Sequence, residues 1–146
     1  MKTRVFAIIH EQEKFLLIRE TNIRFKNQWY LPGGTLETNE DLTIGLIREV
    51  KEEAGFEVGV NGIFFVRHLS LPVARKGLYV YCSARTIQGE LKTNADEHSI
   101  EAQWFARNEI LKLDARDNLL EIIQHYDDQL PLLPTGQFQL SHQMIL

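Results

Sequence analysis

The sequence predicts a single α/β domain over residues 1–146, a sandwich in which helices pack on a mixed β-sheet. Apolar runs rich in β-branched residues alternate with two helical patterns, one in the middle of the chain and one near its end. The composition, with 44% hydrophobic and 25% charged residues, is that of a globular protein. The chain is long enough to bury an ordinary core.

Five apolar runs predict the strands of this sheet. The predicted strands are residues 4–10, 14–19, 58–69, 77–87 and 101–106. The first two runs are separated by a short polar segment, which is the pattern of a β-hairpin. Pro32 and the two glycines that follow it are expected to end any regular element. The tail, from about residue 131 to 146, is expected to be irregular.

Two helices are predicted from the periodicity of apolar residues. From Asp41 to Ala54 the apolar spacing becomes helical, and Gly55 provides a C-terminal stop. Thr38 and Asp41 are both candidates for the N-terminal cap. A second amphipathic helix is expected near residues 116–126.

The charge and the cysteine content limit the partners and the compartment. The net charge of −4 gives no general attraction to nucleic acid or to anionic membranes, so neither is an expected partner. Cys82 is the single cysteine, which leaves no internal disulfide and makes a reducing compartment the default. We therefore expect a cytoplasmic protein with Cys82 buried on a strand. Monomer and homodimer both remain open.

An unusual concentration of acids marks the predicted central helix. Glu49, Glu52 and Glu53 fall within roughly 100° of one another around the helix axis. Like charges at this spacing repel, so a compensating positive charge is expected. Gly45 shares the acidic side, although glycine costs a helix interior about 1 kcal/mol relative to alanine. Something is therefore expected to approach the helix closely at Gly45.

Clustered carboxylates of this kind suit a hard divalent cation such as Mg²⁺ or Mn²⁺. Such an ion typically keeps a few carboxylate ligands and binds substrate phosphates with its remaining positions. It can offset phosphate charge and acidify a water for attack on phosphorus. The alternative is an acidic helix face that is merely solvated, and the adjoining Gly-Gly turn and the spacing favour the metal.

The spacing also carries a family resemblance. Residues 34–56 match the pattern G-x5-E-x7-R-E-U-x-E-E-x-G-U, where U is a bulky apolar residue, at every fixed position. The matching residues are Gly34, Glu40, Arg48, Glu49, Val50, Glu52, Glu53, Gly55 and Phe56. The sequence thus resembles the Nudix hydrolases, whose fold is an α/β/α sandwich with a mixed sheet. The segments NQWYLPGG and GELKT, with the later tryptophan, are similar to small MutT-like nucleoside di- or triphosphate hydrolases.

The resemblance implies a Mg²⁺- or Mn²⁺-dependent pyrophosphatase that cleaves phosphoanhydride bonds. It makes Glu49 and Glu53 the main metal ligands. Glu52 would share a metal or hold its waters, and the carbonyl of Gly33 or Gly34 would complete the site.

The remaining catalytic groups follow from the same resemblance. Arg48 is expected to orient the acids through Glu40 or a helix glutamate rather than to act directly. Family members commonly draw a further acid from the loop that here reads NADEHSIEAQW. Glu97 is the preferred candidate and Glu101 the alternative. His98 occupies the position where the acid is often found, and is expected to contact substrate or to lie at the surface.

The resemblance to MutT-like hydrolases includes those that act on oxidised guanine nucleotides, and the residue chemistry of one loop would suit a purine. Arg19, at a strand end, is a candidate phosphate contact. The following loop offers a cation, stacking surfaces and an amide for the base, and its candidates are Arg24, Phe25, Asn27 and Trp29. For Trp29 a place in the core is an equal alternative.

Two other functions remain as alternatives. Pro72 lies sixteen residues beyond Phe56, a placement that the family associates with hydrolysis of ADP-ribose, so ADP-ribose or a nucleoside diphosphate sugar is the second substrate class. The other alternative is a non-catalytic Nudix domain that senses a nucleotide. Such a module should lack a helix glutamate, and this chain retains all of them.

Overall fold

The computed structural model describes residues 2–70, 76–116 and 118–135. Its strands are β1 (Lys2–Ile8), β2 (His10–Glu11), β3 (Lys14–Arg19), β4 (Trp29–Tyr30), β5 (Gly33–Thr35), β6 (Phe56–Leu69), β7 (Gly77–Gly89) and β8 (Glu101–Ala106). Its helices are α1 (Leu42–Ala54), α2 (Arg107–Ile110) and α3 (Leu119–His125). Pro72, on which the ADP-ribose alternative was based, lies outside the described residues, as does the tail beyond residue 135.

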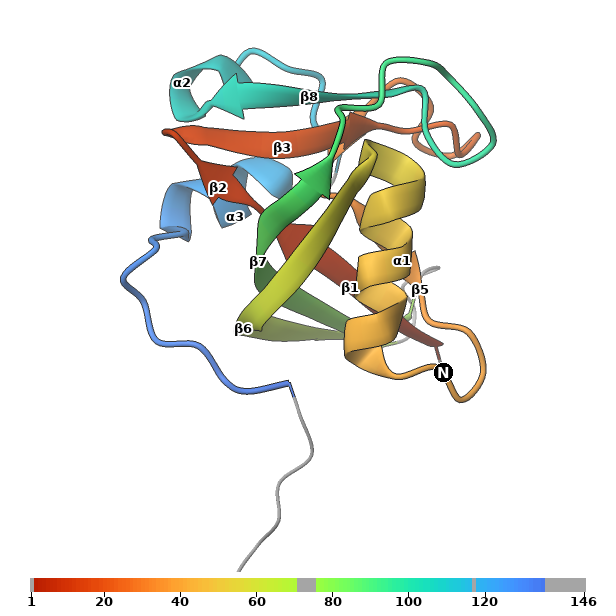
Figure 1. Ribbon diagram of the computed structural model, residues 1–146, viewed down its shortest axis with the longest axis vertical. Helices are drawn as coiled ribbons and strands as arrows, with labels where there is room; N and C mark the ends of the chain where they lie inside the picture. The colour runs from red at the N-terminus through yellow and green to blue at the C-terminus, as the bar shows by residue number, and fades with distance from the viewer. Residues whose placement is uncertain (1, 71–75, 117, 136–146) are drawn as a thin grey trace, which may run out of the picture.

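The strands form two sheets rather than one. The first has the order β5-β1-β7-β6 and is mixed, because β1 runs parallel to β7 while the other neighbours are antiparallel. The second is antiparallel, with β3 paired to β2, β4 and β8. The predicted α/β sandwich with a mixed sheet is therefore confirmed (Figure 1).

The predicted hairpin between residues 4–10 and 14–19 is wrong over most of its length. Only His10 and Glu11 pair with β3, whereas β1 belongs to the other sheet. The chain changes sheets at Ile9, which is fully buried and accepts a hydrogen bond from the amide of Leu16. Both faces of β1 are buried, and a strand with two buried faces reads as a continuous apolar run whichever sheet it joins.

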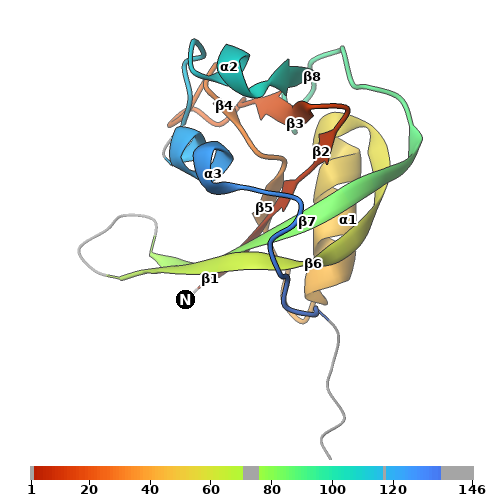
Figure 2. The same cartoon turned by 90° about the vertical axis from the view of Figure 1, so that its left-hand side faces the viewer.

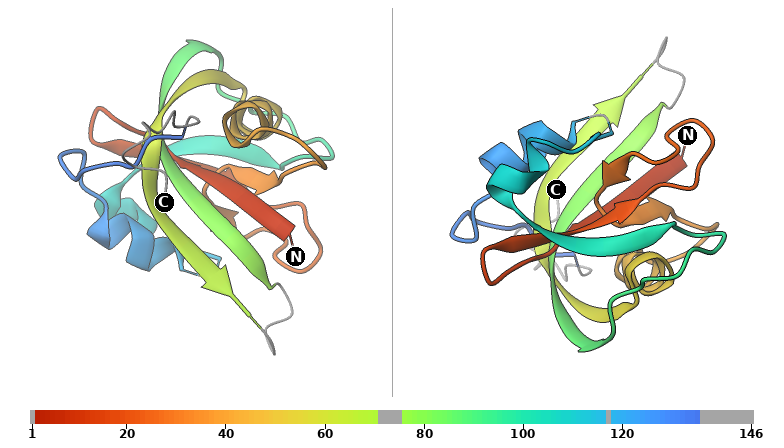
Figure 3. Two further views of the ribbon diagram at one scale, coloured as in Figure 1. Left: turned by 90° about the horizontal axis from the view of Figure 1, so that it is seen from below. Right: turned by 90° about the horizontal axis from the view of Figure 1, so that it is seen from above.

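The two long helices cover opposite sides of the sheets (Figures 2 and 3). Alternate residues of β1 divide between the two sides, as the pleat of a strand requires. Phe6 and Ile8 join a core cluster with the apolar side of α3, which includes Ile122. Val5 and Ala7 join a second cluster that contains the apolar side of α1. This arrangement is the predicted α/β/α sandwich.

Helix α1 has the predicted ends. Asp41 is the N-terminal cap, and its carboxylate accepts hydrogen bonds from the amides of Thr43 and Ile44. Gly55 follows the helix in the left-handed conformation, with φ of 89°, and its amide donates to the carbonyl of Lys51. The expected close approach at Gly45 is also present, since a Cβ there would lie 2.3 Å from Leu36 Cδ2.

Three other local expectations need correction. The Gly-Gly turn does not end regular structure, because residues 33–35 form β5 against β1. The short helix α2 follows β8 directly and was not predicted. Helix α3 begins at Leu119 rather than near residue 116. After α3 the described chain is mostly irregular, although Leu133 makes an isolated bridge to Ile63 on β6.

Cys82 lies fully buried on β7, as expected. Burial raises the pKa of its thiol to about 12, so it remains protonated and inert at neutral pH. None of the helices in the described part of the chain has the length and apolar composition needed to span a membrane.

The cap at Gly55 gives a first prediction, on stability. A Cβ at this position would lie 2.1 Å from the carbonyl oxygen of Glu90, in a backbone conformation that other residues rarely adopt. We expect Gly55→Ala to lower the free energy of unfolding by about 1–3 kcal/mol in urea denaturation. Gly59→Ala is the matched control, because its Cβ would meet only the end of the Arg85 side chain. Equal losses for the two variants would contradict the prediction.

Candidate active site

A cavity of about 510 Å³ lies on the acidic side of α1. Strand β5, the segment after β3 and the loop before β8 also contribute residues to its lining. The segment after β3 and the loop before β8 are joined by a hydrogen bond from Thr21 Oγ1 to the carbonyl of Glu97. The described lining residues are Phe6, Glu20, Thr21, Asn22, Gly33, Gly34, Thr35, Glu37, Arg48, Glu49, Glu52, Glu53, Glu97, His98 and Arg116.

Arg48 contacts several acids of residues 34–56. Its Nε and Nη2 donate to the two carboxylate oxygens of Glu40, over 2.8 and 2.9 Å, in a bidentate pair. Its Nη1 donates to Glu49 at 3.1 Å and to Glu52 at 3.3 Å. Arg48 is thus hydrogen-bonded to three glutamates, among them Glu40, which the sequence analysis had named as a candidate partner.

Glu49 and Glu52 are close enough to affect one another. Partial burial raises the pKa of Glu49 above its ordinary value, and although Arg48 opposes this rise, the charge of Glu52 adds to it. The Glu49 carboxylate lies close to β5, since a Cβ on Gly34 would lie 2.8 Å from it. Only a residue without a side chain leaves this space between strand and helix.

Glu53 is the most buried acid of the cavity. Burial raises its pKa well above the ordinary value, although the Gly33 amide, which donates to Glu53 Oε1 over 2.6 Å, opposes the rise. The nearby charges of Glu49 and Glu20 raise the pKa further, while Arg116 lowers it. The Glu53 carboxyl is therefore less readily ionised than an exposed one, and a nearby cation would favour its ionised form.

The residues fit a divalent cation that is shared with a substrate. Among the described residues, no three histidine, cysteine or acidic side chains converge on one point as a complete metal cage would require. Glu49, Glu52 and Glu53 nevertheless open into the same cavity. Mg²⁺ prefers to be coordinated by a few carboxylates, with phosphate oxygens and water in its remaining positions.

The loop before β8 separates the two candidate distal acids. Glu97 lines the cavity with 84% of its side chain exposed, and His98 lies beside it, 3.5 Å from Glu52. Glu101 instead forms an ion pair with Arg19 at 2.6 Å. Glu101 is not among the described residues of the cavity. The geometry therefore favours Glu97 over Glu101.

The predicted phosphate and base contacts are not brought to this cavity. None of Arg19, Arg24, Phe25, Asn27 and Trp29 is among its described lining residues. Trp29 is in the core, with its ring edge-on to another aromatic ring at 4.8 Å, which is the alternative that the sequence left open. Arg24 lies over its neighbour Phe25, 5.6 Å from the ring centroid. Asn27 has a φ of 69° and serves the turn.

The structure adds a buried ion pair that the sequence did not single out. Arg116 Nη1 donates to Glu20 Oε1 over 2.7 Å, and both residues line the cavity. Glu20 directly follows Arg19, so alternation along β3 points the two side chains in different directions. This alternation is the sequence signal that could have identified Glu20, because only one of two neighbouring charged residues on a strand can point into the site.

The fold and the cavity define an α/β domain whose acid-rich helix and adjoining glycine strand form an oxygen-donor site. A family model described as the NUDIX domain matches residues 1–126. The chain belongs to the Nudix family, as the resemblance of residues 34–56 had indicated. Members of this family typically depend on divalent metal ions.

Named relatives agree with this membership. The human 8-oxo-dGDP phosphatase NUDT18 is 35% identical over 128 residues, covering 84% of this chain and 38% of that protein. An ADP-ribose pyrophosphatase of Methanocaldococcus jannaschii is 34% identical over 111 residues, covering 75% of this chain and 64% of that protein. A crystal structure of a NUDIX hydrolase from Nitrosomonas europaea superposes with a TM-score of 0.72 at 26% identity, over 90% of this chain and 75% of that one. The chain spans well under half of the length of the human relative. The activity of that whole protein is therefore not assigned to this chain.

The contact between Arg48 and Glu40 gives a prediction on pH. Hydrogen bonds from Arg48 and from the Glu37 amide lower the pKa of Glu40 from 4.5 to about 2. The ionised carboxylate therefore stabilises the fold fully above about pH 5, and this contribution is lost as the pH falls toward 2. We expect Glu40→Gln to cost about 1–3 kcal/mol of unfolding free energy at pH 7.

The difference from the unmodified protein should shrink steadily between pH 4.5 and pH 2, as followed by urea denaturation at each pH. Glu37→Gln is the control, because Glu37 is 71% exposed and lies 3.9 Å from Arg48. A cost for Glu40→Gln that stays constant down to pH 2 would exclude an ionised Glu40 as the source.

Proposed function

We propose that the protein is a divalent-metal-dependent hydrolase that cleaves the phosphoanhydride bonds of nucleoside di- and triphosphates. One observation carries this proposal: Glu49, Glu52 and Glu53 open together into a cavity of about 510 Å³ while Arg48 orients two of them. A divalent cation bound there would supply charge compensation for phosphate oxygens and acidify a water. The carboxylates hold that cation, and the cavity provides room for the phosphate chain.

The protein's own groups account for positioning and proton transfer. Glu53 is fixed by the Gly33 amide, and Glu49 by Arg48, so both ligands are held before substrate arrives. Glu97 accepts a proton from the attacking water or directs that water at phosphorus, since it lines the cavity and is exposed. The neighbouring His98 contacts substrate.

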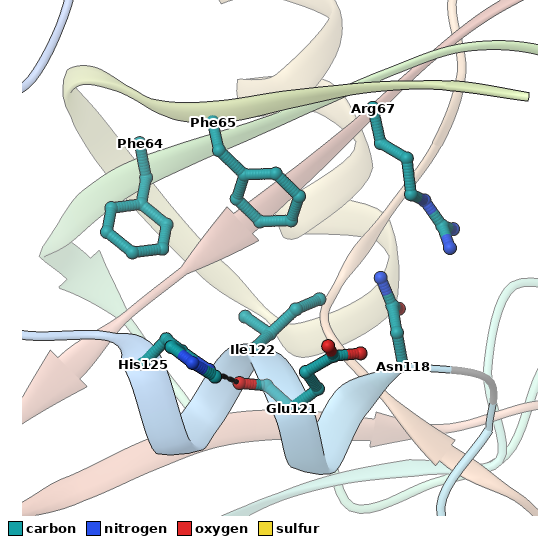
Figure 4. Close-up of a pocket in the computed structure, with 7 residues that line it drawn as sticks. All are labelled: Phe64, Phe65, Arg67, Asn118, Glu121, Ile122 and His125. Carbon is teal, nitrogen blue, oxygen red and sulfur yellow. Dashed lines mark hydrogen bonds between the residues drawn. The ribbon is translucent and has the colours of Figure 1, made fainter.

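A second cavity, of about 430 Å³, offers an aromatic surface for a base (Figure 4). Phe64 and Phe65 on β6 face Ile122 and Glu121 of α3 across it. Asn118 adds an amide at its edge, where a base could be recognised by hydrogen bonds. In this proposal the cavity replaces the loop around Trp29 as the place of the base.

The relatives support two substrate classes. One named relative is an 8-oxo-dGDP phosphatase, which favours a purine nucleoside diphosphate, oxidised guanine included. The other is an ADP-ribose pyrophosphatase, and this similarity keeps ADP-ribose as the second candidate. Competition between a purine nucleoside diphosphate and ADP-ribose decides between them, and a higher specificity constant for ADP-ribose would put the second candidate first.

The central test is hydrolysis of a nucleotide panel in Mg²⁺ or Mn²⁺ and in excess chelator. We expect turnover that disappears with the chelator. Glu53→Gln and Glu49→Gln should each reduce kcat about a hundredfold or more, because each removes a ligand charge but keeps the side-chain shape. Glu57→Gln is the matched control, because Glu57 is exposed on β6 and bonds Gln88 outside the cavity. Folded glutamine variants with undiminished rates would place the chemistry elsewhere.

The two distal acids can be separated in the same assay. We expect Glu97→Gln to lower kcat about tenfold or more with little change in KM, because Glu97 acts on the water and not on binding. Glu101→Gln should have a smaller effect, since Glu101 is paired with Arg19. An unimpaired Glu97 variant beside an inactive Glu101 variant would reverse the assignment.

A further inference from the structure

Arg116 is a cation in the acidic cavity that the proposed chemistry does not use. It lies between α2 and α3, and its amide donates to the carbonyl of Trp29. Its side chain is only 6% exposed, yet it lines the cavity together with the helix acids.

The guanidinium of Arg116 is held on several sides. Nη1 donates to Glu20 over 2.7 Å, in a pair whose side chains are 6% and 11% exposed. Its central carbon lies 4.0 Å from the ring centroid of Phe25 and 4.5 Å from that of Tyr30. Stacking against aromatic rings fixes the plane of a guanidinium and leaves the N–H groups at its edge.

Arg116 has donor capacity that the described residues do not fill. Its Nε is buried and has no hydrogen-bond partner among them, as is also the case for the Nε of Arg19, which lies outside the described lining of the cavity. Arg48, in the same cavity, donates from Nε, Nη1 and Nη2 to glutamates. A buried arginine with unfilled donors is costly unless an acceptor arrives, and the planar fork of N–H groups matches the oxygens of a phosphate.

We propose that Arg116 binds an anionic oxygen of the substrate's phosphate chain, opposite the acids of α1. This inference rests on the proposed function, and it assigns phosphate recognition to Arg116 in place of the predicted Arg19. Arg19 is paired with Glu101 and is not among the described residues of the cavity.

A purely structural ion pair predicts a different pattern of variants. If Glu20 and Arg116 only stabilise the fold, removing either charge leaves the other buried and unpaired, so both variants suffer alike. If Arg116 recognises phosphate, the two charges act in opposite directions on an anion. Loss of Arg116 then weakens binding, while loss of the Glu20 charge removes a repulsion.

The test measures binding of imidodiphosphate, a non-hydrolysable analogue of pyrophosphate, by calorimetry in Mg²⁺ buffer. We expect Arg116→Gln to raise Kd about tenfold or more, and Arg116→Lys to raise it by less because the charge remains. Glu20→Gln should bind within about twofold of the unmodified protein or more tightly. Circular dichroism establishes that each variant is folded.

Two further variants serve as controls for effects of the substitutions on the fold. The double variant Glu20→Gln/Arg116→Gln leaves no unpaired charge, and it should bind as weakly as Arg116→Gln. Arg107→Gln is the matched control, because Arg107 also stacks on an aromatic ring, Phe15 at 5.0 Å, but is not among the described residues of the cavity. It should bind like the unmodified protein.

The inference is overturned if the unmodified protein does not bind imidodiphosphate. It is also overturned if the folded Arg116 or double variants bind within about twofold of it, or if Glu20→Gln loses as much affinity as Arg116→Gln. Hydrolysis of the nucleotide panel by the unmodified protein is scored separately. Arg116-dependent binding without turnover would contradict the proposed function alone, whereas turnover that is indifferent to Arg116 would contradict this inference alone.

Discussion

The acidic site depends on the hydrogen bonds that the guanidinium of Arg48 makes with its glutamates. Without it, the carboxylates at one side of α1 would repel one another and the loop before the helix would have no anchor there. Its bidentate pair with Glu40 ties that loop to the helix, while its remaining donor reaches Glu49 and Glu52. The missing side chain at Gly45 lets Glu40 and Leu36 pack against the helix. Glu53, the most buried of the acids, instead accepts a hydrogen bond from the amide of Gly33.

A second constraint is the burial of both faces of β1. One face packs on the side of α1 and the other on the side of α3, so the strand fixes the two helices relative to each other. Strand β5 pairs with β1. This pairing brings Gly33 to the carboxylate of Glu53 and Gly34 to that of Glu49. The site is therefore held by core packing as well as by its own ion pairs.

The two cavities differ in the chemistry of the residues that line them. The larger is lined mostly by polar and charged groups on the α1 side, whereas the smaller presents Phe64 and Phe65 opposite α3. Tyr30 contacts a lining residue of each cavity. Its buried hydroxyl is hydrogen-bonded to Tyr81 and to Asn118 of the smaller cavity, and Arg116 of the larger cavity lies over its ring.

The sequence by itself determined the features that depend on local spacing. Helical periodicity and the stop at Gly55 predicted α1, and the spacing of residues 34–56 predicted the acidic face and its arginine, whereas the structure decided for Asp41 over Thr38 as the cap. These follow from one helix and its flanking residues, so neighbours in the sequence are neighbours in space.

Only the tertiary structure decided what depends on distant segments. It moved β1 to a different sheet from β3, because a strand buried on both faces carries no signal of its partner. It also separated Glu97 from Glu101 and brought Glu20, from the end of β3, to Arg116, which is 96 residues away in the chain. Such pairs are set by how the sheets and loops pack, and no periodicity within a single segment encodes them.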